Sequence, residues 1–560
     1  MNLKDLKALS FTFRYVKSES KLLILLVLSI VFFVILSVVS LLPPYFSKLA
    51  FDKALINKNL DLLTKYVLII AGSYFLKSIL NYVCAGIFTF FNQKVILAIK
   101  NDLVSRILRL PLEFFSSNES GYIISRFREV DSLSAIFSLQ SFKLILSIFE
   151  FFGAAFIMFT MDVKLTIILM LLIPVFYVIS HIFSSTFTKV TDQTMEKGAV
   201  FQGKFQQSIS GVEEIKRLNL EEKEAENITK TNKEYAKLMI KYSIVTALGS
   251  EVIMLLSSLV GVLLLYLGGR SIVQENMTIG TYIAFSGYFA KLYAPVINWS
   301  LSIYMFKPAF VALDRIEDFF LKYPLEDDEN KIKVESIEYI KMENINFAYP
   351  NREALVLKNF NLDAKIGDKV LLKGPNGSGK STVIRLILGF FENYDGRILI
   401  NGTELRELNK KSLKNKISIV SQKIFLFNDT LENNIKISGE VEPEKYEEAL
   451  KKSGLKDFIE KLPLKDKTLV GENGMSLSGG EIHKVAIARA ILKTDAQVFI
   501  FDEATAHLDV ETKELVKKFI KEELNDKLCI IIDHSDYFDN LCNKIVDLDT
   551  KTIKRGEMNE

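Results

Sequence analysis

The sequence predicts a helical membrane domain of six spans followed by an α/β domain built around a phosphate-binding loop. Long apolar runs dominate the chain up to about residue 310, whereas from about residue 325 it reads as an ordinary charged α/β protein. The mean hydropathy of +0.22 is too high for a purely soluble chain in which 24% of the residues are charged. We therefore place about half of this 560-residue protein in lipid.

The six spans are expected where apolar runs approach the ~20 residues that a helix needs to cross a bilayer. These runs are 22–42, 62–91, 135–161, 165–183, 244–269 and 279–306. We expect the first to end at Pro43 and Pro44. It is too long for the core of a signal peptide and no small-residue cleavage site follows it, so we keep it as a retained helix.

Lysine and arginine predict the orientation of these spans. The segments before span one, between spans two and three, and between spans four and five are rich in Lys and Arg. The connections 161–164 and 270–279 are short and poor in charge. Because positive loops stay inside, the N-terminus, both long loops and the soluble domain are predicted to be cytoplasmic, in a multi-pass protein of the cell membrane.

The composition excludes several other classes of partner and site. The chain has 70 Lys and Arg against 67 Asp and Glu, so it has no excess charge that would favour nucleic acid as a partner. Its three cysteines and four histidines are scattered, and no Cys/His pair has the spacing of metal ligands. The sequence therefore predicts neither a disulfide framework nor a metal centre built from these residues.

The soluble domain begins with a complete phosphate-binding loop. The segment "GPNGSGKST" follows the apolar strand "KVLLK" and precedes the helical segment "TVIRLILG". Its glycines let backbone N–H groups approach phosphate oxygens, Lys380 neutralises charge on the β- and γ-phosphates, and the Ser381 hydroxyl can bind Mg²⁺. The residues expected to hold a nucleotide here are Gly374, Asn376, Gly377, Ser378, Gly379, Lys380, Ser381 and Thr382.

A second strand, "VFIFDE" at 498–503, ends in two carboxylates. Asp502 is placed to hold Mg²⁺, directly or through water. Glu503 lies one residue further, where it can polarise a water that attacks the γ-phosphate. The alternative, a merely solvated strand end, is disfavoured by the phosphate-binding loop in the same domain.

A third motif, "LSGGE", opens the helical segment "IHKVAIARAIL". Ser478, Gly479 and Gly480 offer a hydroxyl and unobstructed backbone N–H groups at the positive end of a helix dipole. This is a second phosphate site, about a hundred residues after the first.

With its motifs in this order, the soluble part resembles the nucleotide-binding cassette of an ABC transporter, and the whole chain resembles an exporter-type half-transporter of the multidrug, peptide and lipid exporter group. The resemblance implies that Tyr349 in "FAYP" stacks on adenine and that Gln422 in "IVSQ" senses Mg²⁺ and the attacking water. It implies that His534 is the switch histidine at the γ-phosphate and Asp509 the D-loop carboxylate. It also implies that 478–480 serve ATP bound to a second cassette, so that two cassettes face head to tail and sandwich two ATP molecules.

The resemblance divides the chain into a transmembrane domain (1–320), a linker (321–335) and a nucleotide-binding domain (336–560). The two long cytoplasmic connections are helix-prone, and each contains a break in the pattern, at 110–121 and at 208–216. These breaks are either ordinary loops or short transverse coupling helices that touch the cassette and transmit its movement.

The chain departs from the family pattern at several positions, including some that are presented to the partner, and Ile482-His483-Lys484 stand where arginine is common. Glu481 stands where glutamine is usual, Ala506 begins a D-loop that usually begins with serine, and Ser535 follows the switch histidine where arginine is common. These changes leave a heterodimer open, although we favour a homodimer.

Polar and ionisable residues within the spans are the candidates for binding the cargo. An ionisable or polar residue within a span is a functional hypothesis by default, and the candidates are Lys143, Glu150, Glu251, Tyr288, Lys291 and Asn298. The two glutamates could instead pair with lysines between helices. A cavity with both signs of charge suits an amphipathic peptide or drug-like molecule and argues against a purely anionic lipid.

The sequence therefore predicts an ATP-driven, Mg²⁺-dependent exporter of an amphipathic cargo that works by alternating access as a dimer. A lipid flippase or a siderophore-type importer of the same architecture is the alternative. A non-transporting membrane ATPase that regulates another protein is a more remote one.

Overall fold

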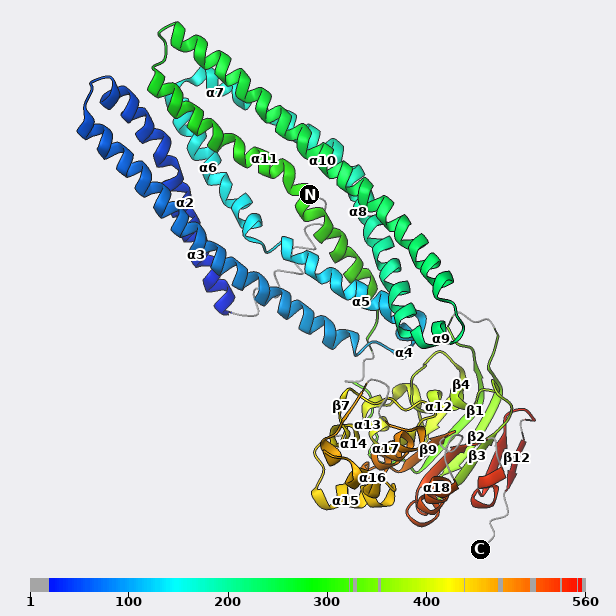
Figure 1. The fold of residues 1–560 in the computed structure, drawn as a ribbon. Helices are drawn as coiled ribbons and strands as arrows, with labels where there is room; N and C mark the ends of the chain where they lie inside the picture. Colours follow the sequence, from blue (N-terminus) through cyan, green and yellow to red (C-terminus); the bar gives the residue numbers. More distant parts are fainter. Residues whose placement is uncertain are drawn as a thin grey trace. The chain divides into compact units, whose positions relative to one another are not determined.

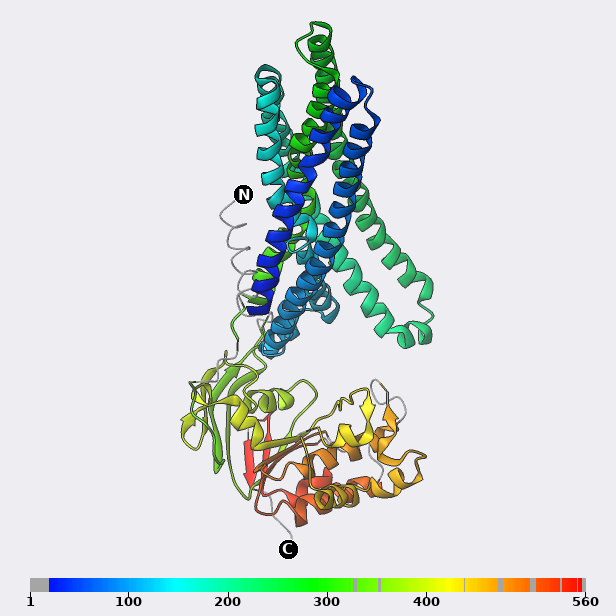
Figure 2. The same ribbon diagram turned by 90° about the vertical axis from the view of Figure 1, so that its left-hand side faces the viewer.

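The computed structural model describes residues 20–321, 323–325, 330–350, 354–437, 439–471, 477–503, 510–533, 536–550 and 552–555. The chain forms two compact units (Figures 1 and 2). The first comprises Met1–Leu110 and Asn118–Pro324, and the second comprises Pro111–Ser117 and Leu325–Glu560. The first unit is helical and the second is α/β.

Long helices make up the first unit. In chain order they are α2 (Ser20–Leu49), η1 (Ala50–Leu55), α3 (Leu60–Ile107), α5 (Ser120–Arg128), η2 (Glu129–Ala135), α6 (Leu139–Met161), α7 (Val163–Met170), α8 (Ile173–Ser210), α9 (Val212–Arg217), α10 (Glu221–Val273), α11 (Ile279–Ile316) and η3 (Glu317–Leu321). Among the described residues, six stretches are long and apolar enough to cross a membrane. This confirms the predicted six-span domain.

Several helices are much longer than a bilayer is thick. The 53 residues of α10 extend over about 80 Å, against about 30 Å for the hydrocarbon core.

Two short helices stand within the breaks expected in the long connections: α4 (Leu112–Ser117) and α9.

The prediction that the first span ends at Pro43 and Pro44 is wrong. α2 runs through both prolines to Leu49 and continues in η1. Because proline has no N–H donor, the carbonyls of Val39 and Ser40, four residues before the two prolines, lose their usual helical bonds. The Ser47 hydroxyl donates to the Pro43 carbonyl at 2.9 Å, and the Tyr288 hydroxyl of α11 donates to the Leu41 carbonyl at 2.9 Å. These bonds fall on carbonyls near the orphaned ones, and packing against neighbouring helices lets a membrane helix tolerate proline.

Where the structure describes the second unit, its strands form three sheets. One is antiparallel, in the order β2 (Leu357–Lys365), β1 (Tyr339–Phe347), β4 (Asp395–Ile400), β5 (Thr403–Glu404). The largest has the order β12 (Thr552–Arg555), β11 (Lys544–Asp547), β3 (Lys369–Lys373), β10 (Leu528–Ile532), β9 (Val498–Asp502), β6 (Ile417–Val420). Neighbouring strands of this sheet run parallel to each other, except for the pair β11 and β12, which is antiparallel. A small third sheet pairs β7 (Asp429–Thr430) with β8 (Leu469–Val470).

Helices surround these sheets. They are α12 (Lys380–Ile387), η4 (Leu405–Glu407), α13 (Lys410–Asn415), α14 (Leu431–Ile435), α15 (Pro443–Lys452), α16 (Lys456–Lys461), η5 (Lys465–Lys467), α17 (Gly479–Leu492), α18 (Val510–Glu522) and η7 (Asp536–Leu541).

The largest sheet is buried on both faces, as its continuously apolar strands require. Val370 and Leu372 of β3 join the core that contains α12, whereas Leu371 joins the opposite core with residues of α17 and α18. In the register of the parallel strands, Ile532 pairs with Asp502 on one side and Leu372 on the other. The loops that follow β3, β9 and β10 therefore start from one edge of the sheet.

Candidate functional site

The loop between β3 and α12 has a backbone that only glycine adopts easily. Gly374, Gly377 and Gly379 have φ angles of +141°, +82° and +102°, in the region that side chains disfavour. A Cβ on Gly379 would also stand 2.7 Å from the Leu357 side chain. These glycines therefore let the loop curl tightly at the start of α12, with backbone N–H groups available for a phosphate.

Lys380 lies under this loop and is only 5% exposed. Its ammonium donates to the carbonyls of Gly374 at 2.8 Å and Pro375 at 2.9 Å. Burial lowers the pKa of Lys380, and the nearby Glu503 and Asp502 partly offset that effect. A phosphate beside the ammonium would favour its charged form. The Ser378 hydroxyl oxygen is also buried and has no hydrogen-bond partner among the described residues.

Ser381 and Asp502 bring two oxygens together beside the loop. The Ser381 hydroxyl donates to the Asp502 carboxylate at 3.4 Å. Burial, followed by repulsion from Glu503, raises the pKa of Asp502. A bound cation would relieve this accumulated negative charge, and hydroxyl and carboxylate oxygens are ligands that Mg²⁺ accepts. These two residues therefore fit a magnesium ion.

Glu503 and Gln422, both predicted to act on the attacking water, lie in contact. The Gln422 amide donates to the Glu503 carboxylate at 2.5 Å. Glu503 has a φ of +49°, a strained conformation of the kind that gathers at functional sites. Its N–H donates to the Ile532 carbonyl at 3.1 Å, which anchors it to the end of β10. His534 and Asp509 lie outside the described residues, as do Ala506 and Ser535.

Tyr349 is half-buried, with its ring against Phe347 and Phe391 at centroid distances of 5.1 and 5.4 Å. Its hydroxyl shares a hydrogen bond of 3.0 Å with Thr382 and accepts one of 3.0 Å from Arg385. The aromatic residue is thereby fixed to the first turns of α12. Arg385 was missed in the sequence, because an arginine in an ordinary helical segment carries no signal.

Ser478 caps the N-terminus of α17. Its hydroxyl accepts from the Glu481 N–H at 3.4 Å, and the Glu481 carboxylate accepts from the Ser478 N–H at 2.7 Å. This reciprocal arrangement is a capping box, and the Ser-x-x-Glu spacing could have predicted it. Glu481 therefore has a structural role at this helix. Gly479 is exposed and Gly480, which follows it, is half-buried.

Of the predicted cargo residues, Glu150, Lys143 and Lys291 are half-buried, whereas Glu251 and Asn298 are exposed. Tyr288 is only 1% exposed, and its hydrogen bond to Leu41 holds α11 against α2. Glu150 accepts a hydrogen bond of 2.8 Å from the Ser40 hydroxyl. Lys77 of α3 lies close to Lys291 and was missed, although a lysine inside an apolar run was the signal that could have found it.

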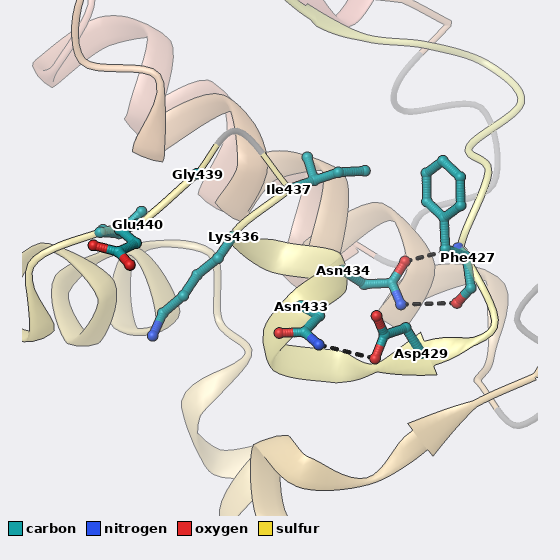
Figure 3. Close-up of a pocket in the computed structure, with 9 residues that line it drawn as sticks. Phe427, Asp429, Asn433, Asn434, Lys436, Ile437, Gly439 and Glu440 are labelled. Carbon is teal, nitrogen blue, oxygen red and sulfur yellow. Dashed lines mark hydrogen bonds between the residues drawn. The ribbon is translucent and has the colours of Figure 1, made fainter. Parts of the chain in front are cut away.

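A surface hollow of about 740 Å³ lies beside α14 (Figure 3). The Asn434 amide spans the backbone of Phe427, accepting from its N–H at 2.8 Å and donating to its carbonyl at 2.9 Å. Asn433 donates to Asp429 at 2.9 Å. None of the residues predicted to bind nucleotide lines this hollow, so the hollow is separate from the predicted nucleotide site.

Comparison with known proteins gives two family matches and several relatives. A model described as "ABC transporter transmembrane region" matches residues 26–296, and one described as "ABC transporter" matches residues 357–506. The ATP-dependent lipid A-core flippase of Syntrophus aciditrophicus (strain SB) is 30% identical over 492 residues, which cover 87% of this chain and 81% of the relative. The cyclolysin secretion/processing ATP-binding protein CyaB of Bordetella pertussis is 28% identical over 504 residues, covering 89% and 70%.

A solved structure, that of a bacterial Atm1-family ABC exporter with ATP bound, has the same fold. It matches with a TM-score of 0.90 and 22% identity and covers 96% of both chains.

Proposed function

This chain belongs to the ABC transporter family, and from this premise we propose that it exports an amphipathic peptide or drug-like molecule across the cytoplasmic membrane by alternating access. Its cassette binds ATP and couples ATP hydrolysis to transport. Its fold is that of a half-transporter, which implies a dimer in a membrane.

The proposal rests on one observation. Four side chains suited to ATP hydrolysis lie together at one edge of the sheet: Lys380, Asp502, Glu503 and Gln422. With ATP in the loop, the Lys380 ammonium exchanges its two carbonyl partners for β- and γ-phosphate oxygens. Glu503, held by the Gln422 amide, accepts a hydrogen bond from the attacking water. Bound Mg²⁺, held by Ser381 and Asp502, would supply charge neutralisation for the phosphates.

We place Ser478, Gly479 and Gly480 on the ATP of a second, identical chain. In support, Gly479 is exposed, and among the described residues nothing lies within 4 Å of where its Cβ would stand. Each charge-assisted hydrogen bond to phosphate contributes about 1.5–3 kcal/mol. Driving a two-state equilibrium from 1:99 to 99:1 takes about 5.5 kcal/mol. Two ATP molecules with several such bonds each are sufficient to close the dimer, and loss of the γ-phosphate reopens it.

The movement of the two cassettes as they close on ATP has to be transmitted to the membrane domain. We propose that the connections at 110–121 and 208–216, which contain α4 and α9, are coupling helices that transmit it. In the proposed orientation the N-terminus and the cassette are cytoplasmic, so closure turns the cargo cavity outward.

A second candidate function is lipid flipping. It is favoured by the similarity to the lipid A-core flippase.

Inside-out membrane vesicles test the proposal. We expect ATP-dependent accumulation of an amphipathic dye in vesicles that contain the protein, and none with ADP or with Glu503→Gln. Accumulation in right-side-out vesicles alone would make the protein an importer. ATP hydrolysis without accumulation of dye, peptide or labelled lipid in either orientation would contradict transport and favour the regulatory alternative.

A further inference from the structure

Three stretches of chain connect the two compact units. The chain passes from the first unit to the second after Leu110, returns at Asn118 and passes over again after Pro324. Within the first unit, α3 precedes the first crossing, α5 follows the second, and η3, the continuation of α11, precedes the third (Figure 1). The contacts of η3 therefore decide whether these three ends move separately or together.

The end of η3 is held by a side chain of α3. The last carbonyls of a helix have no N–H partner within that helix, and those of η3 find donors on Arg106. The Arg106 guanidinium donates from Nε to the Phe320 carbonyl at 2.9 Å. From Nη2 it donates to the carbonyls of Leu321 at 2.5 Å and Tyr323 at 3.1 Å. One side chain therefore binds three carbonyls of the segment through which α11 leaves the first unit.

The chain that returns at α5 packs against the same turn. Tyr122 of α5 meets Phe319 of η3 edge to face, with the ring centroids 5.5 Å apart. The Phe319 ring lies 4.9 Å from that of Phe320, which is completely buried. η3 therefore fastens the end of α3 and the start of α5 to the end of α11.

Arginine is the side chain that this arrangement of carbonyls requires. Its guanidinium is planar and presents five N–H donors in fixed directions, whereas a lysine ammonium is a single point with three donors. A positive charge at the carbonyl end of a helix is also favourable. Arg109, three residues further along the chain, is exposed, whereas Arg106 is half-buried.

We propose that Arg106 is a positioning residue that makes the ends of α3 and α11 move as one body, and that it thereby carries ATP-driven movement of the cassette into the membrane helices. This inference rests on the proposed transport function. α3 leads into α4, the first proposed coupling helix, and α11 leads into the linker. Transmission needs a contiguous, stiff set of elements. Without the bonds of Arg106 each end shifts alone, and less of the movement reaches the helices beyond.

The single tryptophan of the chain reports on that movement without any cargo. Trp299 of α11 lies 18 residues before the start of η3, or about 27 Å along the helix. Its indole donates to the Leu144 carbonyl of α6 at 2.9 Å, and its ring lies 5.7 Å from that of Phe151. Its fluorescence therefore reports on the α6–α11 contact, far from Arg106.

The test uses the full-length protein in nanodiscs, in the Glu503→Gln background that holds Mg-ATP. We expect Mg-ATP to change Trp299 fluorescence in a saturable way. Arg106→Met should reduce the amplitude of this change at least threefold, while a fluorescent ATP analogue binds no more than threefold more weakly. Arg106→Lys should give an intermediate amplitude, because it keeps the charge and part of the donors. Arg109→Met is the matched control and should leave the amplitude within about 1.5-fold of the parent.

The split between amplitude and affinity separates positioning from folding. Loss of ATP binding in Arg106→Met would make Arg106 a residue of the folded state in general and would overturn the inference. An amplitude in Arg106→Met equal to that of Arg109→Met would overturn it as well. So would the absence of any response of Trp299 to Mg-ATP in the parent, because no movement would then reach α11.

Transport is measured separately with Glu503 intact, as dye accumulated in inside-out vesicles per ATP hydrolysed. We expect this ratio to fall at least threefold in Arg106→Met. An unchanged ratio in a protein that transports dye would contradict the positioning role and leave the transport function in place. A Trp299 response that depends on Arg106, without accumulation of cargo in either orientation, would contradict transport and leave the positioning role in place.

Discussion

Replacing Glu503 with glutamine should separate ATP binding from ATP hydrolysis. The carboxylate accepts the Gln422 amide N–H at 2.5 Å, and the oxygen of the new amide can accept the same bond. Repulsion from Glu503 is one of the causes that raise the pKa of Asp502, after burial, so its removal favours the ionised Asp502 that a cation requires. Binding of Mg-ATP should therefore be retained or tightened.

Hydrolysis should fall, because an amide cannot accept the proton of the attacking water. Loss of a general base costs roughly a factor of 100 to 10,000 in rate, or about 2.7–5.4 kcal/mol of barrier. Phosphate release by the purified protein in nanodiscs measures turnover, and a fluorescent ATP analogue measures binding in the same sample.

The matched control is Glu523→Gln. This glutamate is exposed and pairs with Lys452 at 2.8 Å, so its replacement should change turnover by less than twofold. Turnover of Glu503→Gln within about threefold of the parent, a loss below roughly 0.7 kcal/mol of barrier, would refute the role given to Glu503. Loss of ATP binding together with turnover would refute the separation.

Three further predictions concern the same cassette. Lys380→Ala should abolish ATP binding and transport because the β- and γ-phosphates lose their cation, and near-normal transport in vesicles would contradict the nucleotide site. Asp502→Asn should raise the midpoint of thermal unfolding of the nucleotide-free protein and remove its stabilisation by Mg-ATP. Because folding raises the pKa of Asp502, the protonated carboxyl is compatible with the folded state at low pH. The free energy of unfolding falls as the pH rises through that pKa and the buried carboxyl ionises. The gain in midpoint should therefore be larger at pH 8 than at pH 5, and a lower midpoint at pH 8 would contradict it. Glu481→Gln should keep the capping box and tighten apparent ATP affinity by about 1 kcal/mol, or roughly fivefold, as measured from the ATP dependence of turnover, and unchanged affinity would place Glu481 away from the partner's ATP.

The parts of the fold that depend on periodicity and on short motifs could be predicted from the sequence. The apolar runs and the strands "KVLLK" and "VFIFD" specify their own surroundings, because a run without polar residues has to be buried on every side. The path of α2 through Pro43 could not be predicted in this way. This path accompanies packing against α11, whose Tyr288 bonds the Leu41 carbonyl from more than two hundred residues away in the chain.

In the predicted site, too, residues in short motifs could be named from the sequence, whereas residues that act through distant partners could not. Lys380 and Asp502 could be named because their loops have characteristic spacing. Arg385 and Ser40 matter only through the partners they reach, Tyr349 and Glu150. Such partners depend on tertiary packing, which no local pattern records. The capping role of Glu481 is different from these. The Ser-x-x-Glu spacing that indicates a capping box is present in the sequence, although we treated Glu481 there only as a departure from the family pattern.

We expect ATP to be held between the phosphate-binding loop of one copy and the Ser478 segment of another. Asn376 and Gly479 are both exposed, and the native cysteines Cys84, Cys529 and Cys542 are buried. Asn376→Cys and Gly479→Cys are therefore combined in one chain, in the Glu503→Gln background, and treated with a short bismaleimide with and without Mg-ATP.

With this arrangement of ATP between two copies, a covalent dimer should form with Mg-ATP and should require both cysteines. Neither single-cysteine variant should form one. Monomer alone in the presence of Mg-ATP, or a dimer that forms equally without nucleotide, would contradict it.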